Sequence, residues 1–163
     1  MLKEKLQNDM KESMKAGDAN KRMVLSLVMS AIKNKELEKR TKLSKAGTDT
    51  GKLEELSMLS EEEVADVISS EVKKRKESVV SYENAGRNEL AQKEKSELVI
   101  LMEYMPEQIS EEEIRIEAKK AIADVGAKDI KEMGKVLGIL MPKIKGKADG
   151  QTVSKIVKEE LSK

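Results

Sequence analysis

The stretch that decides the fold is Met133-Gly134-Lys135-Val136-Leu137-Gly138-Ile139-Leu140-Met141-Pro142-Lys143-Ile144-Lys145-Gly146-Lys147-Ala148-Asp149-Gly150. Its apolar residues recur at helical spacing and predict one buried helix face, made of Met133, Leu137, Leu140, Met141 and Ile144. Pro142 has no amide hydrogen to donate within a helix, so we expect the helix to kink or end near Leu140. A turn rich in lysine and glycine follows, so one short stretch combines a packing face with a concentration of positive charge.

Two glycines lie inside this predicted helix, where a glycine costs about 1 kcal/mol relative to alanine. On a helical wheel, Gly134 and Gly138 lie beside the apolar face, and Lys131 and Lys135 lie just beyond them. We interpret the glycine pair as a close-approach face, where another group comes near the helix backbone. The sequence leaves that group open: it is a neighbouring helix, a phosphate backbone or another protein.

The composition predicts helices packed on helices. The 163 residues are enough for one domain or two small ones. The chain has no Phe, Trp or Cys and only two Tyr, so its core must consist of Leu, Ile, Val, Met and Ala. We therefore expect an all-α protein, in which methionine fills the irregular gaps between helices.

The missing residue types also exclude several kinds of site. Without His or Cys, the chain cannot form a Ser-His-Asp triad, a Cys-His nucleophile pair or a Cys/His zinc site. The acidic run Glu111–Glu113 follows Ser110, and a helix-capping box explains it more simply than a metal or acid–base cluster. No phosphate-binding P-loop is present. We predict no catalytic residues, no metal and no cofactor.

The sequence gives no sign of a membrane or an oxidising compartment. No apolar run is long enough to span a bilayer, and the N-terminal residues 1–6 include no apolar signal core. The absence of cysteine means that the fold needs no disulfide. We expect a cytoplasmic protein.

The first part of the chain predicts four helices, over residues 2–16, 19–40, 60–85 and 87–105. Ser60 and Glu63 form a capping box at the third of these starts, and Gly86 supplies the left-handed residue at its end. The second half of the 87–105 helix is apolar nearly all round, so we expect it to be a central core element. Residues 41–57 have little periodic hydrophobicity and are the best candidate for disorder.

The second part begins after Pro106, with a predicted hinge at residues 107–110. Three short amphipathic helices follow, and such helices can bury their apolar stripes only against one another. We therefore predict an N-terminal four-helix domain over residues 1–106 and a C-terminal three-helix bundle over residues 110–163. Each of the three helices starts at a Ser or Asp that can cap it: Ser110, Asp129 and Asp149.

The candidate binding site lies in the C-terminal part. Residues 128–158 contain eight lysines against three acidic residues, an excess of five positive charges. Alternating lysines beside a helix start suit phosphate oxygens. We predict a nucleic-acid-binding site there, made of Lys131, Lys135, Lys143, Lys145, Gly146 and Lys147. The alternative is a solvated lysine-rich turn with no ligand.

A second basic run, Lys73-Lys74-Arg75-Lys76, lies within the predicted third helix. Successive helix residues rotate by about 100°, so the four bases cannot point one way. We interpret the run as a secondary basic patch for phosphates or, alternatively, as a solvated helix face.

Several motifs resemble those of a known family: Asp129-x-x-x-Met133-Gly134-Lys135-Val136, Leu140-Met141-Pro142-Lys143, Lys145-Gly146-Lys147-Ala148-Asp149-Gly150, Glu103-Tyr104-Met105-Pro106-Glu107-Gln108, Lys73-Lys74-Arg75-Lys76-Glu77-Ser78 and Ala85-Gly86-Arg87. The tail is similar to the one shared by the YqeY family and GatB, the B subunit of the tRNA-dependent amidotransferase. Nearly the whole chain looks like a free-standing YqeY protein. In GatB the similar tail is a helical appendage that helps engage tRNA.

The resemblance implies an accessory protein that binds tRNA or another structured RNA. Glutamine-dependent carbon–nitrogen ligase activity would need other domains, so we expect no independent amidotransferase activity. A protein-interaction adaptor that uses Gly134 and Gly138 as a docking face is the alternative.

Overall fold

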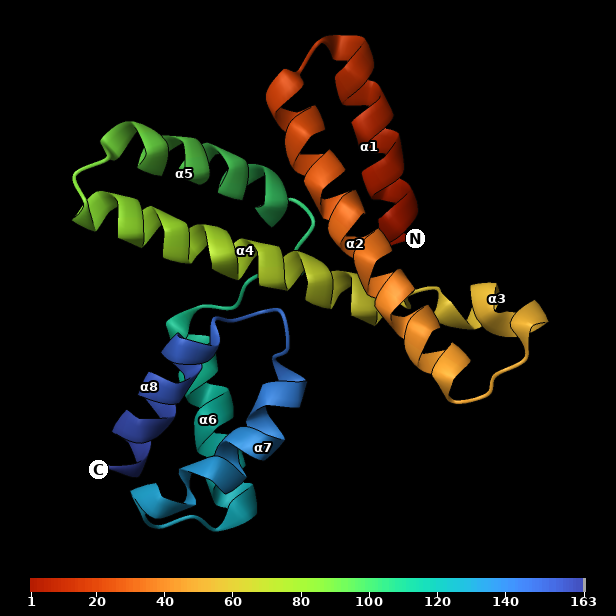
Figure 1. The fold of residues 1–163 in the computed structure, drawn as a ribbon. Helices are drawn as coiled ribbons and strands as arrows, with labels where there is room; N and C mark the ends of the chain where they lie inside the picture. The colour runs from red at the N-terminus through yellow and green to blue at the C-terminus, as the bar shows by residue number, and fades with distance from the viewer. Residues whose placement is uncertain (163) are drawn as a thin grey trace. The chain divides into compact units, whose positions relative to one another are not determined.

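The computed structural model describes residues 1–162, and within them every regular element is a helix. The predicted all-α class is therefore confirmed. The chain divides into two compact units, Met1–Tyr104 and Met105–Lys163 (Figure 1).

The first unit is built mainly from two helical hairpins (Figure 1). Helices α1 and α2 form one hairpin, and α4 and α5 form the other; their bounds are Leu2–Ala16, Ala19–Lys45, Glu61–Asn84 and Asn88–Met102. Leu25, Ile68 and Leu101, from three different helices, are all fully buried. The predicted capping box is present, because Ser60 Oγ accepts from the Glu63 amide while Glu63 accepts from the Ser60 amide. Gly86 has the predicted left-handed backbone, with φ of 69°.

The expectation of disorder at residues 41–57 is wrong. Helix α2 continues to Lys45, and a 3-10 turn at Thr50–Lys52 leads into a short helix α3, Leu53–Ser57. Leu53 is only 4% exposed, and α3 packs against α2. One buried leucine without periodic neighbours gives little sequence signal, but its burial orders the segment. This unit therefore has a fifth, short helix beyond the four predicted.

Helix α5 is buried on one stripe rather than nearly all round. Leu101 is fully buried, but Val99 is 66% exposed. The buried stripe includes an acidic residue instead, because Glu97 is 4% exposed. The apolar composition of this helix therefore overstated its burial.

The second unit is a three-helix bundle around one apolar core (Figure 1). Its helices are α6, Glu111–Val125, α7, Met133–Lys143, and α8, Gly150–Leu161, and a 3-10 turn at Ile130–Glu132 precedes α7. The deepest core residues come from all three helices and include Ala118, Ala121, Val136, Leu140, Val153 and Val157. Ser110 and Asp149 cap α6 and α8 as predicted. Asp129 caps the 3-10 turn rather than α7 itself.

Helix α7 departs from the predicted apolar face in two ways. Met141 is 38% exposed, whereas Val136, which the prediction left out, is fully buried. The helix also continues through Pro142 to Lys143 instead of ending near Leu140. Pro142 lies in the last turn, where its missing amide removes one bond, to the carbonyl of the exposed Gly138. The helix tolerates the proline because only this one bond is lost, and the Ile144 amide still donates to the Leu140 carbonyl at 3.3 Å.

Candidate nucleic-acid interface

The two glycines of α7 face open space. Gly134 and Gly138 are exposed, and a Cβ atom built on either would meet no other residue within 4 Å in the part of the chain that the structure describes. A neighbouring helix of the same unit therefore does not explain them. A close approach to this part of α7 stays a prediction, and no residue of the second unit makes it.

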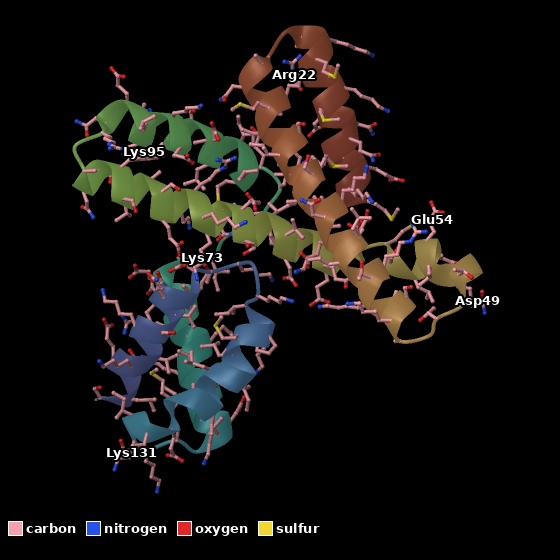
Figure 2. The ribbon with its side chains drawn as sticks, in the orientation of Figure 1. Arg22, Asp49, Glu54, Lys73, Lys95 and Lys131 are labelled. Atoms are coloured by element: carbon pink, nitrogen blue, oxygen red, sulfur yellow. The ribbon has the colours of Figure 1, made fainter. Side chains whose placement is uncertain are left out.

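Two lysines accompany the glycines. Lys131 and Lys135 are exposed, and Figure 2 shows Lys131 at the turn that leads into α7. Lys135 on α7 and Lys131 in the 3-10 turn before it lie on the side away from the fully buried Leu140. We define the outer face of α7 as the exposed residues on that side, together with Lys131 of the preceding turn: Lys131, Gly134, Lys135, Gly138 and Pro142.

The charges on the outer face are only weakly compensated. Lys135 Nζ lies 3.4 Å from Glu132 Oε1, but the Lys135 side chain is 71% exposed. Such an exposed pair contributes little, because water screens it. Lys131 has no ion-pair partner among residues 1–162.

The carboxylates near these lysines accept hydrogen bonds from backbone amides. Glu132 accepts from the Lys128 amide at 2.9 Å, and this bond, followed by that to Lys135, holds the pKa of Glu132 below its usual value. Asp129 accepts from the Lys131 amide at 3.2 Å, and Asp149 accepts from the Thr152 amide at 3.1 Å. Asp129 and Asp149 therefore serve as caps, Glu132 holds the loop before α7, and the lysine side chains keep an excess of positive charge.

Lys143 and Lys147 lie elsewhere, beside α6. They line a hollow of about 250 Å³, which we call the α6–α7 groove, together with Ile109, Glu113, Ile116, Glu117 and Ile144. Lys143 Nζ is 3.6 Å from Asp124 Oδ2. The pKa of Glu117 is lowered mainly by its hydrogen bond with Lys120, and Lys143 adds to this. The structure thus divides the predicted cluster between the outer face and the groove.

Gly146 has an internal role in the turn that follows α7. Its φ is 73°, and a Cβ there would lie 3.5 Å from Pro106 Cγ. Gln108 Nε2 donates to the carbonyl of Gly146 at 2.8 Å, and the Ile109 amide donates to the carbonyl of Lys147 at 2.9 Å. The turn therefore holds residues 106–109, which overlap the hinge predicted at residues 107–110, within the second unit. Lys145 is exposed beside it.

The second basic run is not one patch. Arg75 Nη1 lies 2.6 Å from Glu97 and 3.1 Å from Glu94, and its side chain is only 11% exposed. Arg75 therefore serves the packing of α4 on α5. Lys73, Lys74 and Lys76 remain exposed, and Lys73 and Lys74 form surface ion pairs with Glu77 and Glu71. Figure 2 shows Lys73 on α4.

The described residues hold no cluster of three or more side chains suited to a metal ion. Within residues 1–162, no helix combines the length and the apolar character that crossing a membrane requires. What the second unit offers is cationic side chains on a rigid helical support.

Comparison with known proteins assigns the chain to a family. The model of the YqeY family, described as YqeY-like protein, matches residues 3–161. The chain belongs to this family. The resemblance that the sequence motifs indicated is thereby confirmed over nearly the whole chain.

Three curated relatives are yeast proteins named Altered inheritance of mitochondria protein 41, mitochondrial. The Candida glabrata protein is 28% identical over 102 residues, which cover 63% of this chain and 48% of that protein. The Eremothecium gossypii protein is 30% identical over 100 residues, or 61% and 46% of the two chains. The Vanderwaltozyma polyspora protein is 29% identical over 126 residues, or 76% and 60%. This YqeY-like chain thus matches only about half the length of the first two relatives.

Proposed function

We propose that this YqeY-like protein binds structured RNA, with tRNA as the favoured ligand, through the outer face of α7, as a non-catalytic accessory factor. The observation that carries the proposal is the pair of exposed glycines, Gly134 and Gly138, which have no neighbour of their own within 4 Å. Two glycines lower the stability of this helix, and the unit does not use either of them in its own packing.

The outer face suits a sugar–phosphate backbone. Glycines leave the helix surface bare, so a bulky backbone can come close, and Lys131 and Lys135 supply ammonium groups beside them. Base stacking is disfavoured because the chain has only two aromatic residues, and Tyr104 is 4% exposed. Recognition by shape and backbone, as in folded or duplex RNA, is the mode that remains.

The family resemblance supports tRNA over other folded RNAs, because the similar tail of GatB helps engage tRNA. The proposal does not depend on compartment. The sequence led us to expect a cytoplasmic protein and the relatives are named mitochondrial, but tRNA is present in both places.

Filter binding of unfractionated tRNA to the full chain tests the proposal. The double variant Lys131→Glu/Lys135→Glu should weaken retention by about tenfold or more at moderate salt, because each substitution replaces a phosphate contact by repulsion. The matched control is Lys73→Glu/Lys74→Glu/Lys76→Glu, which reverses more charge on α4 and should change retention less. Circular dichroism would confirm that both variants remain helical. Equal retention by the parent and the outer-face variant would refute the site.

A protein-interaction adaptor is the second candidate. The exposed Ile139 and Met141, at 40% and 38%, flank the glycines and could contact an apolar partner surface. A stoichiometric protein recovered after nuclease treatment, together with no tRNA retention, would favour the adaptor. We propose that this chain alone does not catalyse amide transfer. Transfer of an amide group from glutamine by the purified protein would contradict that part of the proposal.

A further inference from the structure

We propose that the α6–α7 groove binds an acidic linear segment of a partner protein, in which a large apolar side chain is followed by carboxylates. The groove is distinct from the outer face of α7, so this proposal goes beyond the RNA-binding function. It rests on the shape of the hollow, on its exposed apolar wall and on the imbalance of its charges.

The groove has an apolar lining that the bundle does not cover. Ile144 is 4% exposed and Ile109 is half-buried, so both belong to the edge of the core. Ile116, on α6, is 49% exposed in the same hollow. A partner side chain seated against these three isoleucines would remove apolar surface from water.

The charged residues at the rim of the groove favour an anionic ligand. Glu113 already accepts from the Ser110 amide and hydroxyl, at 2.8 and 2.9 Å, and Glu117 is paired with Lys120 at 2.6 Å. On the opposite rim, Lys147 forms no ion pair with any residue in the range 1–162. Lys143 has only its pair with Asp124 at 3.6 Å, in which both side chains are about half exposed. The ammonium group of Lys147, and to a lesser degree that of the weakly paired Lys143, is therefore the charge that the groove compensates least.

A peptide fits these features better than the other classes of ligand. A volume of about 250 Å³ is below the range of about 300–1,000 Å³ typical of small-molecule pockets, so it suits one side chain of a larger partner. Glu113 and Glu117 disfavour a long run of closely spaced phosphates more than one or two carboxylates. A short peptide can place a carboxylate at Lys143 and Lys147 and an apolar side chain against the isoleucines.

The groove is also fixed before any ligand binds. The Ile109 amide donates to the carbonyl of Lys147, and Gln108 donates to that of Gly146, so the basic rim is tied to the start of α6. A rim that is already ordered loses little conformational freedom on binding.

The experiment titrates the full chain, labelled with ¹⁵N, with a blocked tetrapeptide of alanine, leucine and two aspartates. We expect amide shift changes at residues 109–117 and 143–147, and a dissociation constant at least about threefold weaker for a probe with two asparagines. Ile116→Ser and Lys147→Gln should each weaken binding by about fivefold, through lost apolar contact and a lost ion pair. The matched control, Lys131→Gln/Lys135→Gln, should leave the dissociation constant unchanged.

Three results would overturn the proposal. The first is equal binding of the aspartate and asparagine probes. The second is shift changes confined to the outer face of α7. The third is an RNA hairpin that shifts the groove amides when the peptide does not, which would assign the groove to the RNA site. Loss of tRNA retention in the outer-face variants bears on the RNA proposal alone, so the two proposals can fail independently.

Discussion

Basic residues in the two units can have opposite surroundings, as Arg75 and Lys131 show. In the first unit, Arg75 is drawn between Glu94 and Glu97 and is almost removed from solvent. In the second unit, Lys131 stays exposed and unpaired within the described chain, and Lys135 has only a weak surface partner. A basic side chain such as Arg75 becomes part of the packing when the facing helix presents carboxylates. A basic side chain such as Lys131 stays at the surface when the nearby carboxylates accept from backbone amides instead.

Removing the buried arginine should have the largest effect and would test the first half of this comparison. Arg75→Ala leaves Glu97 buried without its partner, so we expect the free energy of unfolding to fall by about 3–5 kcal/mol. Lys74→Ala, which removes a 66%-exposed partner of Glu71, should cost less than about 1 kcal/mol. Urea unfolding followed by circular dichroism measures both. A loss below 1 kcal/mol for Arg75→Ala would mean that the pair is not an integral part of the hairpin.

The turn of the second unit should show the next largest effect. Gly146→Ala puts a side chain on a left-handed residue next to Pro106, so we expect a loss of about 1–2 kcal/mol. Urea unfolding monitors this loss, and ¹⁵N spectra should show changes at residues 106–109, which the turn holds. An unchanged midpoint would contradict the structural role assigned to Gly146.

The outer-face glycines should respond with the opposite sign. Gly138→Ala fills open space on a regular helix, so the free energy of unfolding should rise by about 1 kcal/mol. The same substitution should weaken tRNA retention, because a methyl group holds the phosphate backbone away. A more stable protein with unchanged retention would separate the glycines from function.

Acid should destabilise both units slightly, through their caps. The pKa of Glu63 is lowered by Lys39 and by the Ser60 amide, and the pKa of Glu113 is lowered by the Ser110 amide and hydroxyl. A lowered folded-state pKa stabilises the protein above the usual value of 4.5, and this stabilisation is lost as the pH falls through the folded value.

Melting temperatures from about pH 7 to about pH 3 measure this loss. Glu113→Gln should reduce the fall of the melting temperature at acid pH, the acid limb of the curve. The neutral amide of glutamine can still accept a hydrogen bond at the cap but does not titrate. Identical limbs for the parent and the variant would contradict the assignment.

Much of the fold could be predicted because its signals are local. The capping boxes at Ser60 and Ser110 depend on residues three apart, and the left-handed Gly86 and Gly126 stand at the ends of their helices. Leu53 escaped prediction because a single apolar residue without periodic neighbours shows no pattern in the sequence. Pro142 was read as a stop because its position within the last turn depends on where the helix ends.

The candidate site was harder to predict, because pairing between helices decides which charges remain free. The position of Arg75 could have been inferred from the hairpin, since Arg75 and Glu97 lie at equal distances in sequence from Gly86. The separation of Lys143 and Lys147 from the outer face had no such local signal. It follows from the contact of α7 with α6, which the sequence does not specify.

The salt dependence of tRNA affinity tests the central claim most directly. If Lys131 and Lys135 each neutralise a phosphate, Lys131→Gln/Lys135→Gln should lower the slope of log affinity against log salt by about 1.4–1.8, since each contact contributes about 0.7–0.9. Lys143→Gln/Lys147→Gln removes the same charge from the groove and should leave the slope nearly unchanged. A slope that falls only with the groove variant, or with neither, would contradict the outer-face site.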